Sequence, residues 1–592
     1  MPYLPKLTAG YLSREATEIF GGYNHKLRIN DGEWYDEENI SSAHFPLFSQ
    51  RGKRATVHAG MQTPQGLLAK TALAWVDGDK LYYDKKPVEG ITLSTEAEDC
   101  PKQLVSMGAY ICVFPDGAYF NTVNPDDKGM MATSYKSASG KTITYTPCKL
   151  DGTAYENVTI SATEPKDPAN GKYWMDTSST PHVLKQYSAT NSMWVQIPTV
   201  YVSIGATGIG KAFSEGDGVT ISGAAVTDSA VKEQVAVLNT DSIIQAKGDD
   251  YIIVVGVLDK AVSQTSGTIN VERKVPRLSH VCEANNRLWG CWYGMQDGKM
   301  VNEIYACKLG DFKNWNSFAG ISSDSYRVSV GTDGEFTGCI AYLGYPIFFK
   351  ENCIHKIYGS IPANFQMQNT TCRGVQRGSA GSLAISNEIL YYKSRSDVCA
   401  YDGSLPVGIS EQFGAENYTE AVAGAHAGKY YVSMKGRDDK WNLFVYDTLR
   451  GVWHREDATH ALAFAAIGDE LYYIDVDRKA VIAENGTDGE LEGDVKWYAE
   501  SGIIGYEMID RKYVSRFTMR MRLGSGAECG MYIMYDSDGI WRYEGLIRGG
   551  AMDSFTIPVV PRRCDHFRIR LEGKGDIKLY SIAKILEQGS DV

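Results

Sequence analysis

The sequence predicts an all-β protein with a β-propeller core, inserted small β-domains and a C-terminal β-sandwich. Its 37 Tyr, 18 Phe and 11 Trp supply side chains that fit the pleated surface of a sheet, and its 60 Gly supply tight turns. A hairpin pattern recurs seven times along the chain. The length of 592 residues exceeds what one hydrophobic core usually serves, so several structural units are expected.

The recurring pattern is an apolar strand, a turn of Gly, Asp or Asn, and a second strand that ends in an aromatic pair or its equivalent. Gly, Asp and Asn accept the positive φ of a tight β-turn, so each copy predicts a hairpin. From the third copy onward the spacing is about 40 to 60 residues, which is typical of four-stranded propeller blades. The seven copies are residues 74–83, 105–114, 282–289, 341–349, 384–392, 424–431 and 465–473.

Changes in this rhythm divide the chain into five segments. Pro, Gly, Ser and Thr cluster where the aromatic hairpins are absent, which predicts inserted β-domains. Near the C-terminus, Arg alternates with apolar residues in longer strands, which predicts a sandwich with one solvated or interface-forming face. The segments are a leader that packs on the propeller (1–65), the first blades (66–145), the insertion (146–272), the remaining blades (273–488) and the sandwich (489–592).

Charge and composition argue against several classes of partner. The formal net charge of -12 argues against stable binding to nucleic acid, which requires a basic excess. The start of the chain does not resemble a secretory signal, and the longest apolar stretch, residues 251–258, is too short to insert into a membrane. The twelve Cys are spread singly without a Cys-x-x-Cys pair, which favours free thiols in a reducing cytoplasm.

Two short motifs resemble ligand-binding loops but lack a required residue. Residues 205–212 nearly match a phosphate-binding P-loop, yet Ala212 stands where a Ser or Thr would hold magnesium, and a turn follows instead of a helix. Residues 536–539 have the carboxylate spacing that opens a calcium loop, without the closing glutamate. We therefore expect a turn at each place, with no cofactor and no metal.

Candidate catalytic residues are equally scarce. The ten His are scattered, and His58, His355 and His454 stand singly in strand-like stretches, so we interpret them as structural. Asp-box turns of sialidases are absent, although residues 325–334 loosely resemble one. Paired carboxylates for sugar hydrolysis stay open, because 72 acidic residues ensure that some lie close in space. With no catalytic, cofactor-binding or metal residue to name, the expectation is that the chain is not an enzyme.

Several segments resemble tail-associated propeller proteins that bacterial prophages encode. In the leader these are Gly22-Tyr-Asn-His25, Asp31-Gly-Glu-Trp34 and Phe45-Pro-Leu-Phe-Ser-Gln-Arg51. In the propeller they include Gly310-Asp-Phe-Lys-Asn-Trp315 and Asp333-Gly-Glu-Phe-Thr-Gly338. The chain is similar to the nozzle, or tail tubular protein B, family of short-tailed phages, more so over the leader and propeller than over the insertion and sandwich.

This resemblance implies a virion structural protein of a bacteriophage tail, made in the host bacterial cytoplasm. It implies a homo-oligomeric ring, six-fold by the same resemblance, below the head-tail adaptor, with that adaptor and other tail proteins such as fibres as partners. Genomic DNA would pass through transiently, and an acidic bore would repel its phosphates. Two alternatives remain: a receptor-binding or glycan-binding tail protein that reads its ligand with the insertion, and a polysaccharide hydrolase with two carboxylates in a cleft.

Overall fold

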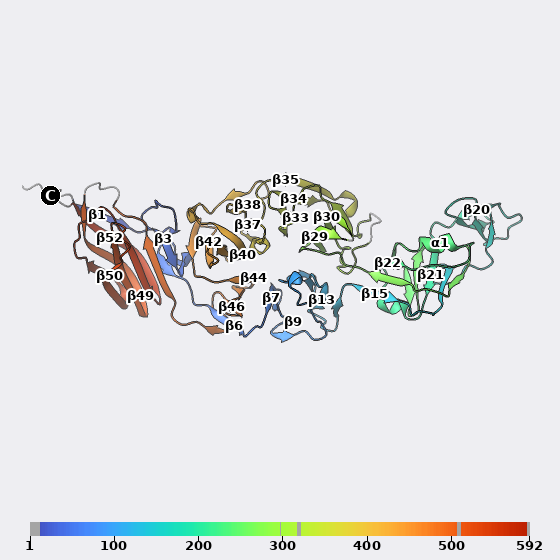
Figure 1. Ribbon diagram of the computed structural model, residues 1–592, viewed down its shortest axis with the longest axis horizontal. Coiled ribbons are helices and arrows are strands. Elements are labelled where there is room, and N and C mark those ends of the chain that lie inside the picture. Colours follow the sequence, from blue (N-terminus) through green and yellow to red (C-terminus); the bar gives the residue numbers. More distant parts are fainter. Residues whose placement is uncertain (1–11, 297, 317–320, 506–510, 589–592) are drawn as a thin grey trace, which may run out of the picture.

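The protein consists of three β-sheet bodies in a row. The computed structural model describes residues 12–296, 298–316, 321–505 and 511–588. A sheet built largely from the C-terminal strands lies at one end, a ring of sheets lies in the middle, and the inserted region lies at the other end (Figure 1). Strands account for nearly all regular structure, and one α-helix, α1 (Lys232–Val237), lies in the inserted region. The predicted all-β fold is therefore confirmed.

The middle body is a ring of seven antiparallel sheets. Six have four strands, and the last has five. The first strands of successive sheets contact one another, the fourth and fifth sheets being linked through the short helix η5 (Ala380–Ser382), and the last sheet returns to the first. This closed ring is the arrangement of a propeller core (Figure 1). The sheets are formed by β7–β10 (64–87), β11–β14 (103–130), β28–β31 (280–329), β32–β35 (338–371), β36–β39 (384–408), β40–β43 (418–455) and β44–β46 (461–483) with β6 and β47.

Each of the seven aromatic hairpins lies in a different sheet of the ring. Six of them join the first and second strands of their sheet, while residues 74–83 join the second and third strands, β8 (Leu73–Asp77) and β9 (Lys80–Tyr83). Their aromatic rings pack between neighbouring sheets, as where Tyr391 lies 5.3 Å from Tyr430. The repeat therefore marks the packing surfaces of the ring.

The N-terminal segment completes the last sheet of the ring. Strand β6 (Ala55–Ala59) pairs antiparallel with β46 (Ala480–Ala483), so the two ends of the ring's sequence meet in one sheet. Beside β6, the buried Arg54 forms ion pairs with Glu456, Asp457 (2.6 Å) and Glu484 (2.8 Å). The leader therefore contributes strand β6 to the last sheet of the ring, in addition to packing on the ring.

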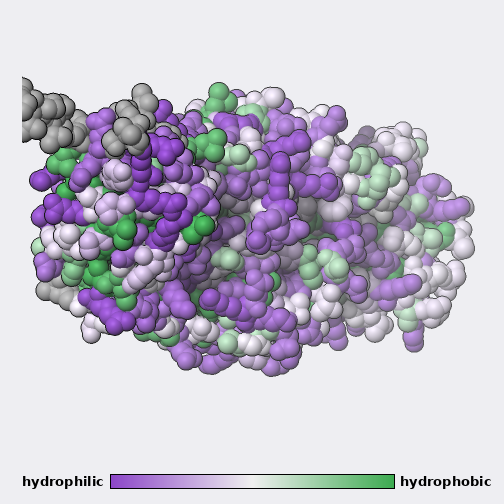
Figure 2. All heavy atoms as spheres, turned by 60° about the vertical axis from the view of Figure 1, so that its left-hand side comes forward, coloured by the Kyte–Doolittle hydropathy of each residue, from purple (hydrophilic) through white to green (hydrophobic). Residues whose placement is uncertain are grey.

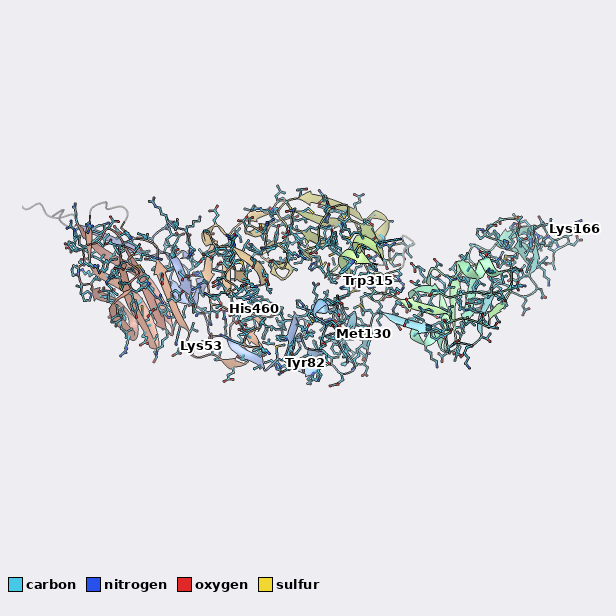
Figure 3. All side chains as sticks on the ribbon, in the orientation of Figure 1. Lys53, Tyr82, Met130, Lys166, Trp315 and His460 are labelled. Atoms are coloured by element: carbon cyan, nitrogen blue, oxygen red, sulfur yellow. The ribbon has the colours of Figure 1, made fainter. Side chains whose placement is uncertain are left out.

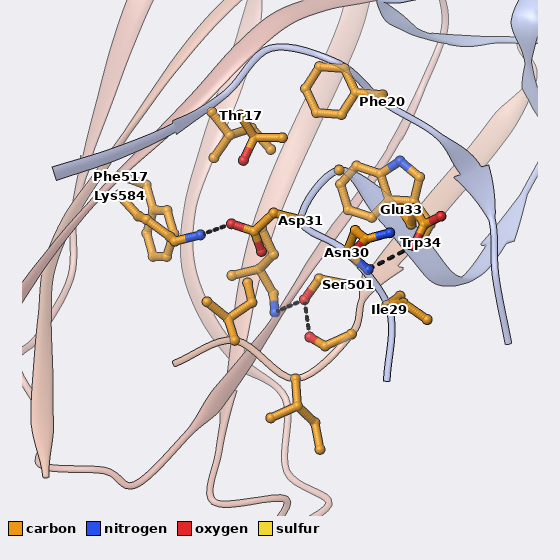
Figure 4. Close-up of a pocket in the computed structure, with 16 residues that line it drawn as sticks. Thr17, Phe20, Ile29, Asn30, Asp31, Glu33, Trp34, Ser501, Phe517 and Lys584 are labelled. Atoms are coloured by element: carbon orange, nitrogen blue, oxygen red, sulfur yellow. Dashed lines mark hydrogen bonds and ion pairs between the residues drawn. The ribbon is translucent and has the colours of Figure 1, made fainter. Parts of the chain in front are cut away.

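The leader also belongs to the ten-stranded C-terminal sheet. Strand β1 (Leu12–Thr17) pairs with β52 (Ile577–Gln588), and β3 (Glu33–Glu38) pairs with β48 (Lys496–Ser501). Figure 4 shows the junction, where Phe20 and Trp34 face the C-terminal strands and Asp31 pairs with Lys584. The cavity there is only about 30 Å³, so these side chains form a core and leave no binding site.

The inserted region begins earlier than predicted. Strands β15 (Thr133–Lys136) and β16 (Ile143–Cys148) belong to its two main sheets, because β15 pairs with β27 (Asn270–Arg273) and β16 with β21 (Tyr201–Gly205). The entering strand therefore lies beside the leaving strand. A third sheet, β17–β20 (159–196), forms the tip, where Figure 3 labels Lys166.

The twelve cysteines are free, and most of them are buried in strands. Burial raises the pKa of the Cys529 thiol to about 12, so this side chain stays protonated as a small hydrophobic group. Within the part of the chain that the structure describes, no helix is long and apolar enough to cross a membrane, and no group of His, Cys, Asp and Glu could hold a metal ion.

Candidate ligand-binding site

The ring encloses a cavity with a volume of about 900 Å³. The first strands of six ring sheets contribute to its wall, and residues just before the remaining sheet, among them Ala380 of η5, complete it. Figure 3 places His460 at the edge of the central opening. The contributing strands are β7 (Pro64–Ala69), β11 (Gln103–Met107), β28 (His280–Ala284), β32 (Gly338–Tyr342), β40 (Tyr418–His426) and β44 (Ala461–Ile467).

Half-buried aromatic rings line this cavity on two sheets. Trp441, at the start of β42 (Trp441–Asp447), stacks on His460 with ring centroids 4.0 Å apart and planes 11° apart. Trp292, on β29 (Arg287–Gln296), lies 4.5 Å below the guanidinium of Arg277.

Ion pairs between neighbouring segments border the same cavity. Glu335 pairs with Arg377 at 3.2 Å, and Glu98 pairs with Arg277 at 3.5 Å. These four side chains are exposed, and exposed ion pairs contribute little to stability. Their oxygen atoms and guanidinium groups can therefore exchange one partner for a polar ligand at small cost.

Three buried polar atoms in the cavity wall have no hydrogen-bond partner in the protein. They are Oε1 of Gln65, the indole Nε1 of Trp292 and Oγ1 of Thr337. A buried polar group without a partner costs about 1–3 kcal/mol, so such groups are rare in folded proteins. One acceptor, one donor and one hydroxyl thus lie in the cavity wall without a partner among the described residues.

A neutral histidine joins three sheets beside these atoms. His280 Nε2 donates to the carbonyl of Phe336 (3.0 Å), and its Nδ1 accepts from Nε2 of Gln103 (3.3 Å). Burial lowers the pKa of His280 to about 4. Burial also lowers the pKa of His460, although Asp477 opposes that shift. Both rings are therefore uncharged near neutral pH and act as hydrogen-bonding and stacking groups.

The sequence motifs that resemble ligand loops lie elsewhere. Strand β21 leads into the short 3-10 helix η3 (Ile209–Ala212), and a Cβ on Gly210 would lie 1.8 Å from the carbonyl oxygen of Gly248. That loop is filled by the protein's own backbone and presents no α-helix to a phosphate. Residues 536–539 form the turn between β49 (Lys512–Tyr535) and β50 (Arg542–Pro558), where Asp538 pairs with Arg542 at 2.6 Å.

The three singled-out histidines are structural. His355 is fully buried and contacts Oγ1 of Thr332 at 2.9 Å, and His454 pairs with Glu37 at 2.8 Å. His58 lies against Trp75 inside the ring. Sequence reasoning missed Trp292, Trp441 and His460, because each belongs to a different segment and no local motif connects them. The tandem aromatic pair at Trp292 and Tyr293, just after a predicted hairpin, was the one available signal.

Comparisons with known proteins give no family. No family model and no curated protein matches the chain. Solved structures with similar sheets include an exo-β-1,3-galactanase from Phanerochaete chrysosporium (9% identity, 52% of this chain, 95% of that chain, TM-score 0.21). They also include a family 43 arabinoxylan arabinofuranohydrolase from Bacillus subtilis (9%, 51%, 94%, 0.19) and a sialidase from Trypanosoma rangeli (8%, 98%, 97%, 0.21).

These comparisons correct one expectation. The lack of a catalytic motif led us to expect that the chain is not an enzyme, but the first four similar structures are glycoside hydrolases. TM-scores near 0.2 carry no argument about activity, so the case for function rests on the cavity itself.

Proposed function

We propose that this chain is a glycan-binding protein and that the ring cavity holds its ligand. The cavity combines partly exposed Trp faces, exposed ion pairs and buried polar atoms without partners. A sugar ring has apolar C–H faces that stack on aromatic rings, and hydroxyl groups that both donate and accept hydrogen bonds. The single observation that carries this proposal is the presence of both kinds of group in one cavity of about 900 Å³.

Binding to a panel of bacterial surface polysaccharides and neutral oligosaccharides tests this proposal. We expect Trp441→Ala to weaken binding at least 10-fold, because it removes the stacking face beside His460. Trp541→Ala is the matched control, since Trp541 is also half-buried but lies beside the C-terminal sheet. Absence of binding across the panel, or equal losses in both variants, would count against the cavity.

The same panel distinguishes binding from hydrolysis. Release of reducing ends by the wild-type protein would add a hydrolase activity to the proposal. We then expect that activity to disappear in a Glu335→Gln, Glu420→Gln variant, because both carboxylates line the cavity and glycoside hydrolysis uses a pair of them. Binding without reducing ends would identify a recognition protein.

The resemblance of the leader and ring to tail proteins supports a phage setting for this binding. In that setting the protein would be a receptor-binding or glycan-binding component of the virion tail. A second candidate is a nozzle subunit that forms a ring below the head-tail adaptor for DNA ejection. The row of three bodies and the open edge of strand β50 (Arg542–Pro558), which among the described residues pairs with β49 alone, favour assembly into a larger structure.

Electron microscopy of the purified protein beside intact virions separates the two candidates. Closed rings of one size, present in the tail between adaptor and tip, would support the nozzle. Monomers that bind glycan and occupy peripheral tail positions would support recognition instead.

A further inference from the structure

The outer face of the C-terminal sheet carries a cluster of cationic side chains. On β49 (Lys512–Tyr535), Phe517, Met519 and Met521 point into the core, while the intervening arginines are exposed. Strands β52 and β1 extend the same face. The cationic face consists of Arg14, Arg516, Arg520, Arg522 and Lys578.

Strand register brings these cations close together. Arg522 lies directly opposite Lys578, and Arg516 and Arg14 both lie opposite Ile585, one on each side of β52. Neighbouring strands are about 4.8 Å apart and alternate residues along a strand about 6.7 Å apart. Arg522 and Lys578 are therefore about one strand spacing apart, and Arg520 and Arg522 lie about 6.7 Å apart along β49. Arg14 and Arg516 are about two strand spacings apart.

The cations of this face are not neutralised by the protein. In the described ranges, Arg14, Arg516, Arg522 and Lys578 form no ion pair, and Arg520 contacts only the hydroxyl of Ser554, at 3.4 Å. Two acidic residues border this face in the register, Asp553 opposite Met521 and Glu587 opposite Leu12, and in the described ranges neither forms an ion pair with these cations. Like charges at this spacing repel one another, which favours binding of an anion.

Hydroxyl groups are interleaved with the cations. Thr518 and Thr556 lie opposite each other across β49 and β50, with Ser554 and Ser581 both opposite Arg520. Arg, Lys, Ser and Thr are the side chains that contact nucleic-acid phosphates, and guanidinium groups bind phosphate in a bidentate manner. The core of a protein–protein interface is instead apolar and depleted in charge. Figure 2, which brings this end of the molecule forward, shows hydrophilic side chains over much of it.

We infer that this cationic face binds the phosphate backbone of nucleic acid without reading its sequence. The negative charge of the whole chain predicted the opposite, but a sum of -12 does not describe the local field at one sheet. Binding on this face is independent of the glycan proposed for the ring, because the two surfaces belong to different bodies.

The test measures binding of the full-length protein to a 30-base-pair duplex DNA of random sequence at several salt concentrations. We expect Arg516→Gln, Arg520→Gln, Arg522→Gln to weaken binding on the order of 100-fold at 0.1 M salt and to lower the salt slope by about three. The matched control is Lys80→Gln, Lys86→Gln, Lys141→Gln, which removes the same charge from exposed positions elsewhere. That control should bind as the wild type does.

Three results would overturn the inference. The first is absence of DNA binding by the wild type at 50 mM salt, and the second is an equal loss in both triple variants. The third is self-association that the arginine variant abolishes while DNA does not bind, which would assign this face to a second copy of the chain. Thermal unfolding of both variants, expected to match the wild type, excludes a folding defect.

Discussion

The ring and the C-terminal sheet differ in the length and exposure of their edge strands. The ring closes on itself, and its last sheet takes β6 from the start of the chain. The C-terminal sheet has strands of 24 and 17 residues, and its strand β50 has a free edge. Exposed apolar side chains accompany that edge, with Tyr543 58% and Met552 57% exposed.

This difference indicates that the ring and the C-terminal sheet have different roles. The outer edge strands of the ring sheets have only two to six residues, so they offer another chain little backbone with which to pair. A long open edge with apolar side chains is a template for pairing, and proteins rarely keep one without a partner. The ring is therefore the self-contained part of the molecule, and the C-terminal sheet is the part suited to contacts with other molecules.

The largest expected effect is loss of ring closure in Arg54→Ala. Arg54 is 1% exposed and pairs with Glu456, Asp457 and Glu484, so its removal leaves the buried carboxyl groups of Glu456 and Glu484 without their cation, while Asp457 keeps Arg51 at 3.9 Å. We expect a loss of about 3–5 kcal/mol in the free energy of unfolding, measured by denaturant titration. Lys53→Ala, at an exposed neighbouring position, should change it by about 0.5 kcal/mol or less. Similar values for the two variants would contradict the closure account.

A smaller effect is expected when the same cluster is titrated with acid. Burial opposes ionisation of Asp457, but Arg54 and the neighbouring groups Thr459 and Arg51 lower its pKa to about 2. Because the folded pKa lies below the unfolded one, this stabilisation is present above pH 4 and is lost as the pH falls toward 2. We expect a loss of about 2 kcal/mol over that range. Asp457→Asn should flatten this part of the pH profile, and an unchanged profile would contradict the assignment.

The corresponding substitution in the C-terminal sheet, Lys584→Met, should cost less. Lys584 is also buried, but its partners Glu15 and Asp31 are 38% and 49% exposed. Water can solvate both carboxylates after the cation is removed, so we expect a loss of about 1 kcal/mol. Denaturant titration beside Arg54→Ala measures the contrast directly. A loss as large as that of Arg54→Ala would remove the distinction between the two bodies.

The smallest effect on stability is expected for Tyr543→Lys on β50. The same substitution should weaken self-association. Tyr543 is exposed and lies 5.5 Å from Tyr532, so its replacement should change the free energy of unfolding by about 0.5 kcal/mol or less. A lysine on an open edge opposes strand pairing, so any self-association through β50 should weaken. Sedimentation velocity compares the variant with the wild type, and unchanged association would move the interface away from this edge.

Local signals in the sequence predicted the hairpins of the ring, but they did not predict which distant strands pair with each other. The seven hairpins were predictable because Gly, Asp and Asn determine a turn within a few residues. The pairing of β6 with β46 was not, because nothing near Ala55 specifies a partner so far along the chain. The leader was for the same reason assigned to the propeller alone, although β1 and β3 pair with C-terminal strands.

The cavity was beyond sequence reasoning for a related reason. Each ring sheet contributes only one or a few side chains to its wall, and these are far apart in the chain. Trp441 begins β42 and His460 immediately precedes β44, and the two rings stack because these strands begin on the same side of the cavity. The recurring Tyr and Trp in the hairpins predicted packing between sheets, and most of them lie in the hydrophobic clusters there.

A structure of the protein with a bound oligosaccharide, determined by crystallography or cryo-electron microscopy, tests the central claim most directly. We predict ligand density inside the ring, stacked on Trp441 and within hydrogen-bond distance of at least one of Gln65, Trp292 and Thr337. Ligand density on the inserted region with an empty ring would contradict this account.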